Sequence, residues 1–169
     1  YLNNGQVSEG KVWLEKVIKQ DKDNAEAYKL LGHLSYNRND FHAAIYYYEI
    51  TRYYRPYDTE VFRYLALAYF FNEEFKEYQQ TVFEMLTTLK DPKQVLTFFV
   101  QEMHKHKHYE QVIRIVERHW NIFNVQYDVL DVLARSYKQI GDKENARRIW
   151  EYVLTQEPKN RKALSGIMT

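Results

Sequence analysis

The chain has 169 residues, of which 45% are hydrophobic, and its 24 Lys and Arg residues against 23 Asp and Glu residues give a net charge of +1. This composition can build a sizeable core, and so small a charge excludes a general electrostatic attraction to nucleic acid or to an anionic membrane. The absence of Cys excludes disulfides, thiolate metal sites and cysteine nucleophiles, while 5 Gly and 3 Pro are too few for many short strands and favour helices.

The predicted elements recur along the chain with a period of 34 residues. Residues 1–24 form a partial unit, residues 25–58, 59–92, 93–126 and 127–160 form four full units without insertion or deletion, and residues 161–169 begin another unit. Within each full unit, apolar or small residues at positions 4, 7, 8 and 11 mark one face of a first helix. A second apolar stripe at positions 17, 20, 24, 27 and 28 predicts a second helix.

This pattern resembles the tetratricopeptide repeat, a 34-residue helix-turn-helix with small residues at positions 8 and 20, an aromatic residue at 24 and Pro at 32. Gly32, Ala44, Tyr48 and Pro56 match it in the first full unit. The resemblance covers 1–169 and implies one all-α right-handed superhelical solenoid of antiparallel helix pairs. Neither end has the polar face of a capping repeat, so we expect a segment of a longer array.

The resemblance also implies a concave groove that is lined by positions 2, 5, 9, 12 and 13 of the first helices. Carried onto this sequence, these groove positions give candidate partner-binding residues in all four units. They are Lys29, His33, Tyr36, Asn37, Arg63, Leu67, Phe70, Phe71, Gln101, His104, Lys105, Arg135 and Lys138.

Phe70 and Phe71 stand at positions where the repeat does not require aromatic residues. If they are exposed, they form an apolar anchor for a partner helix or peptide. The alternative is that the irregular second unit buries one of them beside Tyr78. A second aromatic group, Tyr46, Tyr47, Tyr48, Tyr53, Tyr54 and Tyr57, is interpreted as packing between adjacent units.

Two specialised functions of such repeats lack support. The carboxylate clamp needs Lys at position 5, Asn at 9, Asn at 6 of the next repeat, and Lys at 2 with Arg at 6 of the third. Starting from the first full unit, the chain offers Lys29 but then His33, Tyr64, Gln94 and Phe98. Residues 145–158 resemble a half-a-tetratricopeptide repeat of RNA-processing scaffolds, but only in one unit, and the near-zero charge argues against nucleic acid as a partner.

The stretch MHKHKHY at 103–109 places His104, His106 and His108 at alternate positions, which suggests a metal site. The repeat register puts a turn between His104 and His108, so the three imidazoles point in different directions, and the flanking lysines repel a cation. We therefore expect no metal site and keep only His104 as a groove contact.

The sequence contains no GxSxG elbow, phosphate-binding glycine loop or HExxH motif, and it indicates no catalytic residue, metal or cofactor. Apolar runs such as 96–100 are far shorter than a membrane span and no signal peptide opens the chain, so we expect no direct membrane insertion, with the compartment left open between cytoplasm and periplasm. These features predict a non-catalytic scaffold that binds a peptide or helix of a protein partner in its groove. The alternative is a structural spacer or a self-assembly segment that associates through its uncapped ends.

Overall fold

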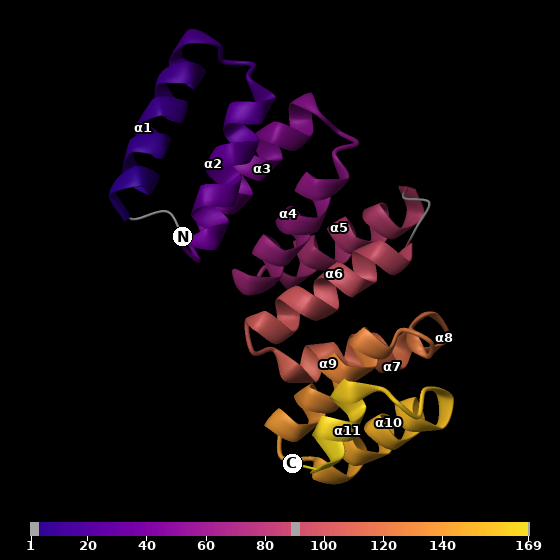
Figure 1. Cartoon of the computed structure of the whole chain (residues 1–169). Helices are drawn as coiled ribbons and strands as arrows, with labels where there is room; N and C mark the ends of the chain where they lie inside the picture. The colour runs from indigo at the N-terminus through magenta and orange to yellow at the C-terminus, as the bar shows by residue number, and fades with distance from the viewer. Residues whose placement is uncertain (1–3, 89–91, 169) are drawn as a thin grey trace. The chain divides into compact units, whose positions relative to one another are not determined.

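The computed structural model describes residues 4–88 and 92–168, and helices are the only regular elements in these ranges. The helices are α1 (Asn4–Gln20), α2 (Ala25–Asn37), α3 (Phe41–Tyr54), α4 (Thr59–Phe71), α5 (Phe75–Thr88), α6 (Pro92–Lys105), α7 (Tyr109–Arg118), α8 (Trp120–Phe123), α9 (Tyr127–Gln139), α10 (Lys143–Gln156) and α11 (Arg161–Met168) (Figure 1). The helices α2, α4, α9 and α11 begin at the first positions of the units expected from the sequence. The division of the chain into repeats stays a prediction.

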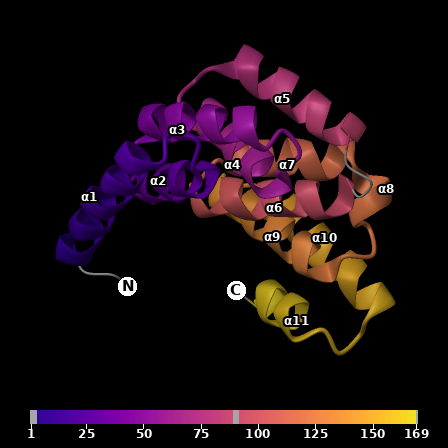
Figure 2. The ribbon, with the colours of Figure 1, turned by 90° about the horizontal axis from the view of Figure 1, so that it is seen from above.

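The chain forms two compact units, Tyr1–Lys90 and Asp91–Thr169. In the first unit each helix packs on the next, from α1 on α2 to α4 on α5, and α2 also contacts α4. In Figures 1 and 2, α2 and α3 lie side by side in both views. In the second unit α6 packs on α7 and α9, α9 packs on α10, and α11 packs on both α10 and α9.

The four turns inside the helix pairs share one backbone geometry. The fifteenth residue of each predicted unit, Asn39, Glu73, Lys107 or Gly141, has a left-handed φ of 59°, 64°, 65° or 87°. In each turn the next residue's N–H donates to the carbonyl five residues earlier, as from Asp40 to Ser35 and from Asp142 to Tyr137, both at 2.9 Å. This is a Schellman motif, which ends a helix and satisfies its last carbonyls. Only one of the four residues is a glycine, although glycine adopts this conformation at least cost.

Side-chain caps start many of the helices. Asn24, Asp40, Asp58 and Asp142 each accept a hydrogen bond from the backbone N–H three residues later, at 3.0 to 3.1 Å. These caps satisfy N–H groups that have no partner inside the helix. The starts of α2, α3, α4 and α10 are therefore each encoded locally by one polar residue.

The core consists of the apolar positions that the repeat pattern predicts. Positions 7 and 8 are buried in all four full repeats predicted from the sequence. They are occupied by Leu31, Leu65, Phe99 and Leu133 at position 7 and by Gly32, Ala66, Val100 and Ala134 at position 8. Gly32 is needed because a Cβ there would lie 2.5 Å from the Tyr48 ring. The small residue therefore lets α2 approach α3 closely.

The second helix of the third predicted repeat is interrupted. Helix α7 ends at Arg118, His119 adopts a non-helical φ of −114°, and the short α8 follows. Phe123 in α8 is nevertheless fully buried. Among residues 4–88 and 92–168, none of the helices combines the length and the apolar character that a membrane span requires.

Candidate functional site

The groove positions of α2 are occupied by contacts within the first unit. The Lys29 ammonium lies 3.2 Å from the Asp58 carboxylate and 2.5 Å from that of Glu60. Because only 14% of the Lys29 side chain is exposed, this ion pair crosses from α2 to the start of α4 with little solvent around it. Lys29 is thus engaged by carboxylates at the end of its own repeat and at the start of the next.

His33 and Tyr36 join an aromatic cluster in the same unit. The Tyr48 hydroxyl lies 2.8 Å from Nδ1 of His33, and the Tyr64 ring lies edge-on to His33 at 4.8 Å and to Tyr36 at 5.0 Å. Burial lowers the pKa of His33 and raises the pKa of Tyr48, so both side chains are neutral near pH 7. Tyr64 fills the space between α2 and α4, and Tyr36 is only 2% exposed.

Phe70 lies in the core of the first unit. It is 7% exposed, and its ring packs against Phe75 at 5.7 Å and Tyr78 at 5.3 Å. This corrects the interpretation of Phe70 as an exposed anchor and agrees with the alternative, burial beside Tyr78. Leu67 is fully buried as well, so it offers no surface to a partner. Phe71 is half-buried against Phe41, with ring centroids 5.0 Å apart.

The other candidates of the first unit keep some solvent exposure, since Asn37 at the end of α2 is exposed and Arg63 in α4 is half-buried. In the second unit Gln101 and Lys105 of α6 are exposed, and the Lys105 ammonium lies 3.3 Å from the Glu102 carboxylate.

The histidines of MHKHKHY lie in and around the turn between α6 and α7. Nδ1 of His104 lies 2.9 Å from the Ser136 hydroxyl, and Nε2 of His106 lies 3.8 Å from the Glu102 carboxylate. Burial, and to a smaller extent the Arg135 guanidinium, lowers the pKa of His104. Within the ranges that the structure describes, no three His, Asp or Glu side chains are grouped closely enough to hold a metal ion. His104 is instead tied to α9.

The tyrosines of α3 and of the segment that follows it do not all pack between helices. Tyr48 is fully buried, but Tyr46, Tyr53 and Tyr57 are 60%, 81% and 84% exposed. The packing interpretation is therefore wrong for these three, which point to solvent. Tyr54 is partly exposed and donates its hydroxyl to Asp23 at 2.8 Å.

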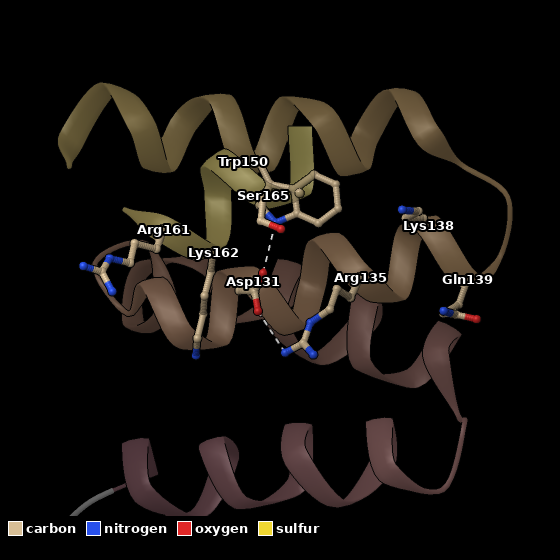
Figure 3. A pocket seen from close by; sticks show the side chains of 9 residues that line it. Asp131, Arg135, Lys138, Gln139, Trp150, Arg161, Lys162 and Ser165 are labelled. Carbon is tan, nitrogen blue, oxygen red and sulfur yellow. Dashed lines mark hydrogen bonds and ion pairs between the residues drawn. The ribbon is translucent and has the colours of Figure 1, made fainter. Parts of the chain in front are cut away.

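The α9 candidates, unlike those of α2, border an open pocket. This pocket lies between α9 and α11 in the second unit and has a volume of about 600 Å³. It is lined by Asp131, Arg135, Lys138, Gln139, Trp150, Arg161, Lys162, Ser165 and Gly166 (Figure 3). Two predicted groove residues, Arg135 and Lys138, are thus brought together with α11 residues that the sequence reasoning did not select.

A hydrogen-bonded triplet forms the centre of this pocket. One oxygen of Asp131 accepts the Trp150 indole N–H at 3.1 Å, and the other lies 2.8 Å from the Arg135 guanidinium (Figure 3). Asp131 is 7% exposed and Trp150 is 4% exposed, so this part of the lining is held rigidly. Figure 3 shows Arg161 and Lys162 to one side of the triplet and Lys138 and Gln139 to the other.

Gly166 leaves the pocket open. It occupies position 6 of its predicted repeat, and the corresponding residue of the repeat at 59–92 is Tyr64. Trp150 occupies position 24 of its repeat, and the corresponding residue of the repeat at 25–58 is Tyr48. Tyr64 stacks on Tyr48 at 6.2 Å, whereas a Cβ on Gly166 would lie 2.2 Å from the Trp150 ring. The larger indole requires a glycine next to it, and no side chain extends from that position into the space between α9 and α11.

No protein-family model and no curated protein matches the sequence. Solved structures do match. The MamA protein has a TM-score of 0.63 at 16% identity over 92% of this chain and 85% of that chain. YrrB, a TPR protein, has a TM-score of 0.55 at 12% identity over 98% of this chain and 85% of that chain. The C-terminal part of a TPR repeat-containing protein from Cytophaga hutchinsonii has a TM-score of 0.53 at 21% identity over 93% of this chain and 65% of that chain.

The chain has the tetratricopeptide-repeat fold. The all-helical architecture expected from the 34-residue period is confirmed by these matches. Three groove positions of the first unit, occupied by Tyr36, Leu67 and Phe70, are buried and contribute to its core. The sequence signal that could have revealed the pocket is the pair of Trp150 and Gly166, a large residue at position 24 followed by the smallest residue at position 6 of the next unit.

Proposed function

We propose that this chain is a non-catalytic protein-interaction scaffold that binds a peptide segment of a partner protein in the pocket between α9 and α11. The observation that carries the proposal is the open space of about 600 Å³ between two first helices, beside a rigid Asp131–Trp150 hydrogen bond. Binding sites are concave and largely preformed, with a few polar groups that fix the orientation of the ligand. One structure with the same fold, YrrB, is described as having an unusual peptide-binding site, which supports this class of function.

Several exposed polar side chains around the pocket favour a peptide as the ligand. Gln139 and Ser165 are exposed and offer an amide and a hydroxyl, and the cationic side chains offer further donors. The helices that carry these groups are fixed by buried contacts such as Ala134 and Ala163. A rigid wall with accessible donors suits a segment that becomes ordered on binding.

The proposal is tested by selecting phage-displayed random dodecapeptides that bind the wild-type protein. The affinity of each selected peptide is then measured for two variants. Ser165→Trp fills the pocket from the exposed face of α11, and Glu144→Trp places the same side chain at an exposed position of α10 that does not line it. We expect the selected peptides to lose binding to Ser165→Trp and to keep it for Glu144→Trp. Unchanged far-ultraviolet circular dichroism of both variants is the folding control. Peptides that bind Ser165→Trp as tightly as wild type would contradict the proposal.

A further inference from the structure

The pocket between α9 and α11 concentrates positive charge. Four cationic side chains, Arg135, Lys138, Arg161 and Lys162, line it together with a single carboxylate, that of Asp131. The lining therefore carries a net charge of +3, although the whole chain carries only +1. A concave site with one sign of charge attracts a ligand of the opposite sign.

The only carboxylate of the lining is already engaged. Asp131 binds the Arg135 guanidinium through one oxygen and the Trp150 indole through the other. Because both oxygens of Asp131 already have donors, this carboxylate offsets part of the positive charge of Arg135. It offsets little of the positive charge of Arg161 and Lys162 on α11. Arg161 makes no ion pair with any side chain in residues 4–88 and 92–168.

Two cations of the pocket already bind carboxylates within the protein. Arg135 holds Asp131 at 2.8 Å, and Lys162 holds Asp128 at 2.7 Å. The Lys162 pair is exposed, with 58% of the Lys162 side chain and 87% of the Asp128 side chain accessible, so it contributes little to stability. A carboxylate of a ligand can therefore take the place of Asp128 at small cost.

The lining is poorly suited to RNA. Proteins that bind single-stranded nucleic acid present exposed aromatic rings on which bases stack. Trp150 is the aromatic residue of this pocket, and it is 4% exposed with its N–H already donated to Asp131. The pocket offers cations and hydrogen-bond donors without a stacking surface, which favours carboxylates over bases.

We propose that the pocket recognises an acidic peptide segment of a partner protein, with carboxylates held by Arg161 and Lys162 at one side and by Arg135 at the other. This inference rests on the proposed function and specifies the chemistry of its ligand. Gly166 is essential to it, because a Cβ at this position would collide with the Trp150 ring, which forms part of the pocket lining.

The test measures fluorescence anisotropy with three labelled probes: hexaglutamate, hexaglutamine and a dodecamer of oligouridylate. The variant Arg161→Glu/Lys162→Glu reverses two pocket charges. Arg118→Glu/Arg114→Glu makes the same double reversal at exposed positions of α7, in the same unit but outside the pocket lining. We expect hexaglutamate to bind wild type and hexaglutamine to bind much more weakly. We expect the dissociation constant for hexaglutamate to rise at least about tenfold in the pocket variant and less in the α7 variant, since tenfold corresponds to about 1.4 kcal/mol.

Three results would overturn the inference. The first is no saturable binding of hexaglutamate up to about 1 mM, the range of very weak complexes. The second is an equal loss of affinity in both double variants, which means that only the overall charge matters. The third is tighter binding of oligouridylate that depends on Arg161 and Lys162, which makes the pocket a nucleic-acid site.

The dodecapeptide selection separates this inference from the proposed function. If selected peptides need the pocket, as shown by Ser165→Trp, but are neutral and insensitive to Arg161→Glu/Lys162→Glu, the scaffold function stands and the acidic ligand is rejected. If no selected peptide responds to Ser165→Trp, both proposals fail.

Discussion

In each of the two compact units, the first helices of neighbouring repeats form a wall. The two walls differ in what occupies the space between their helices. Between α2 and α4, Tyr64 fills this space, and Lys29 and His33 are engaged with Asp58, Glu60 and Tyr48. Between α9 and α11, Gly166 stands at the position of Tyr64, and a pocket remains. The same backbone arrangement thus gives a closed wall or an open one, depending on one side chain of the following repeat.

The largest change in stability is expected in the core of the first unit, where Phe70 of α4 packs against α5. Phe70→Ala should lower the free energy of unfolding by about 3 kcal/mol or more, because a large buried ring leaves a cavity. Urea unfolding followed by circular dichroism measures the change. Phe83→Ala is the matched control, since Phe83 is 69% exposed and its loss should change stability by less than about 0.5 kcal/mol. A Phe70→Ala protein of wild-type stability that binds peptides poorly would restore the interpretation of Phe70 as an anchor.

A smaller effect is expected at the open wall. Gly166→Ala should lower stability by about 1 to 3 kcal/mol, because the new methyl group collides with the Trp150 ring and the indole must shift. The thermal midpoint and near-ultraviolet circular dichroism report the loss of stability and the movement of the indole. Gly10→Ala in α1 serves as the control. It has open space around it and should stabilise the helix by about 0.5 to 1 kcal/mol. If Gly166→Ala stabilised the protein as much as Gly10→Ala does, Gly166 would not be needed beside Trp150.

Substitutions at the left-handed residues of the turns should change stability least, and by similar amounts in both compact units. Replacing Glu73 in the first unit or Lys107 in the second by Gly should stabilise the protein by about 1 kcal/mol, because each residue has a left-handed φ. Gly141→Ala should destabilise it by a similar amount. Chemical denaturation of the three variants checks the signs. A Lys107→Gly variant less stable than wild type would mean that backbone freedom in the unfolded chain outweighs the relief of strain.

Much of the fold follows from the repeat pattern, because helix packing is set by positions such as Leu31 and Ala134 that face the core in each unit. The placement of His104 and His108 on either side of a turn is predicted by the same register and confirmed by the structure. These features depend on residues within one helix pair. The register therefore predicts them without knowledge of neighbouring side chains.

Whether a groove position is covered by a neighbouring side chain or open to a ligand could not be predicted from the repeat register. The register places His33 and Arg135 at the same position 9, yet one is covered by Tyr64 and the other borders a pocket. The difference arises from side-chain size at position 6 of the next unit, which the repeat pattern leaves unconstrained. The exposure of Tyr53 was missed for a related reason, since position alone does not tell which aromatic residues find a partner.

The central claim is that the α9–α11 wall binds an acidic segment while the α2–α4 wall does not. A titration of the ¹⁵N-labelled protein with hexaglutamate, followed by amide chemical shifts, tests it most directly. We predict saturable shifts for amides of Asp131–Gln139 and Arg161–Gly166 and for the Trp150 indole N–H, with the amides of α2 and α4 unchanged. Saturable shifts at Lys29, His33 and Arg63 without shifts at Arg135 and Arg161 would contradict the account.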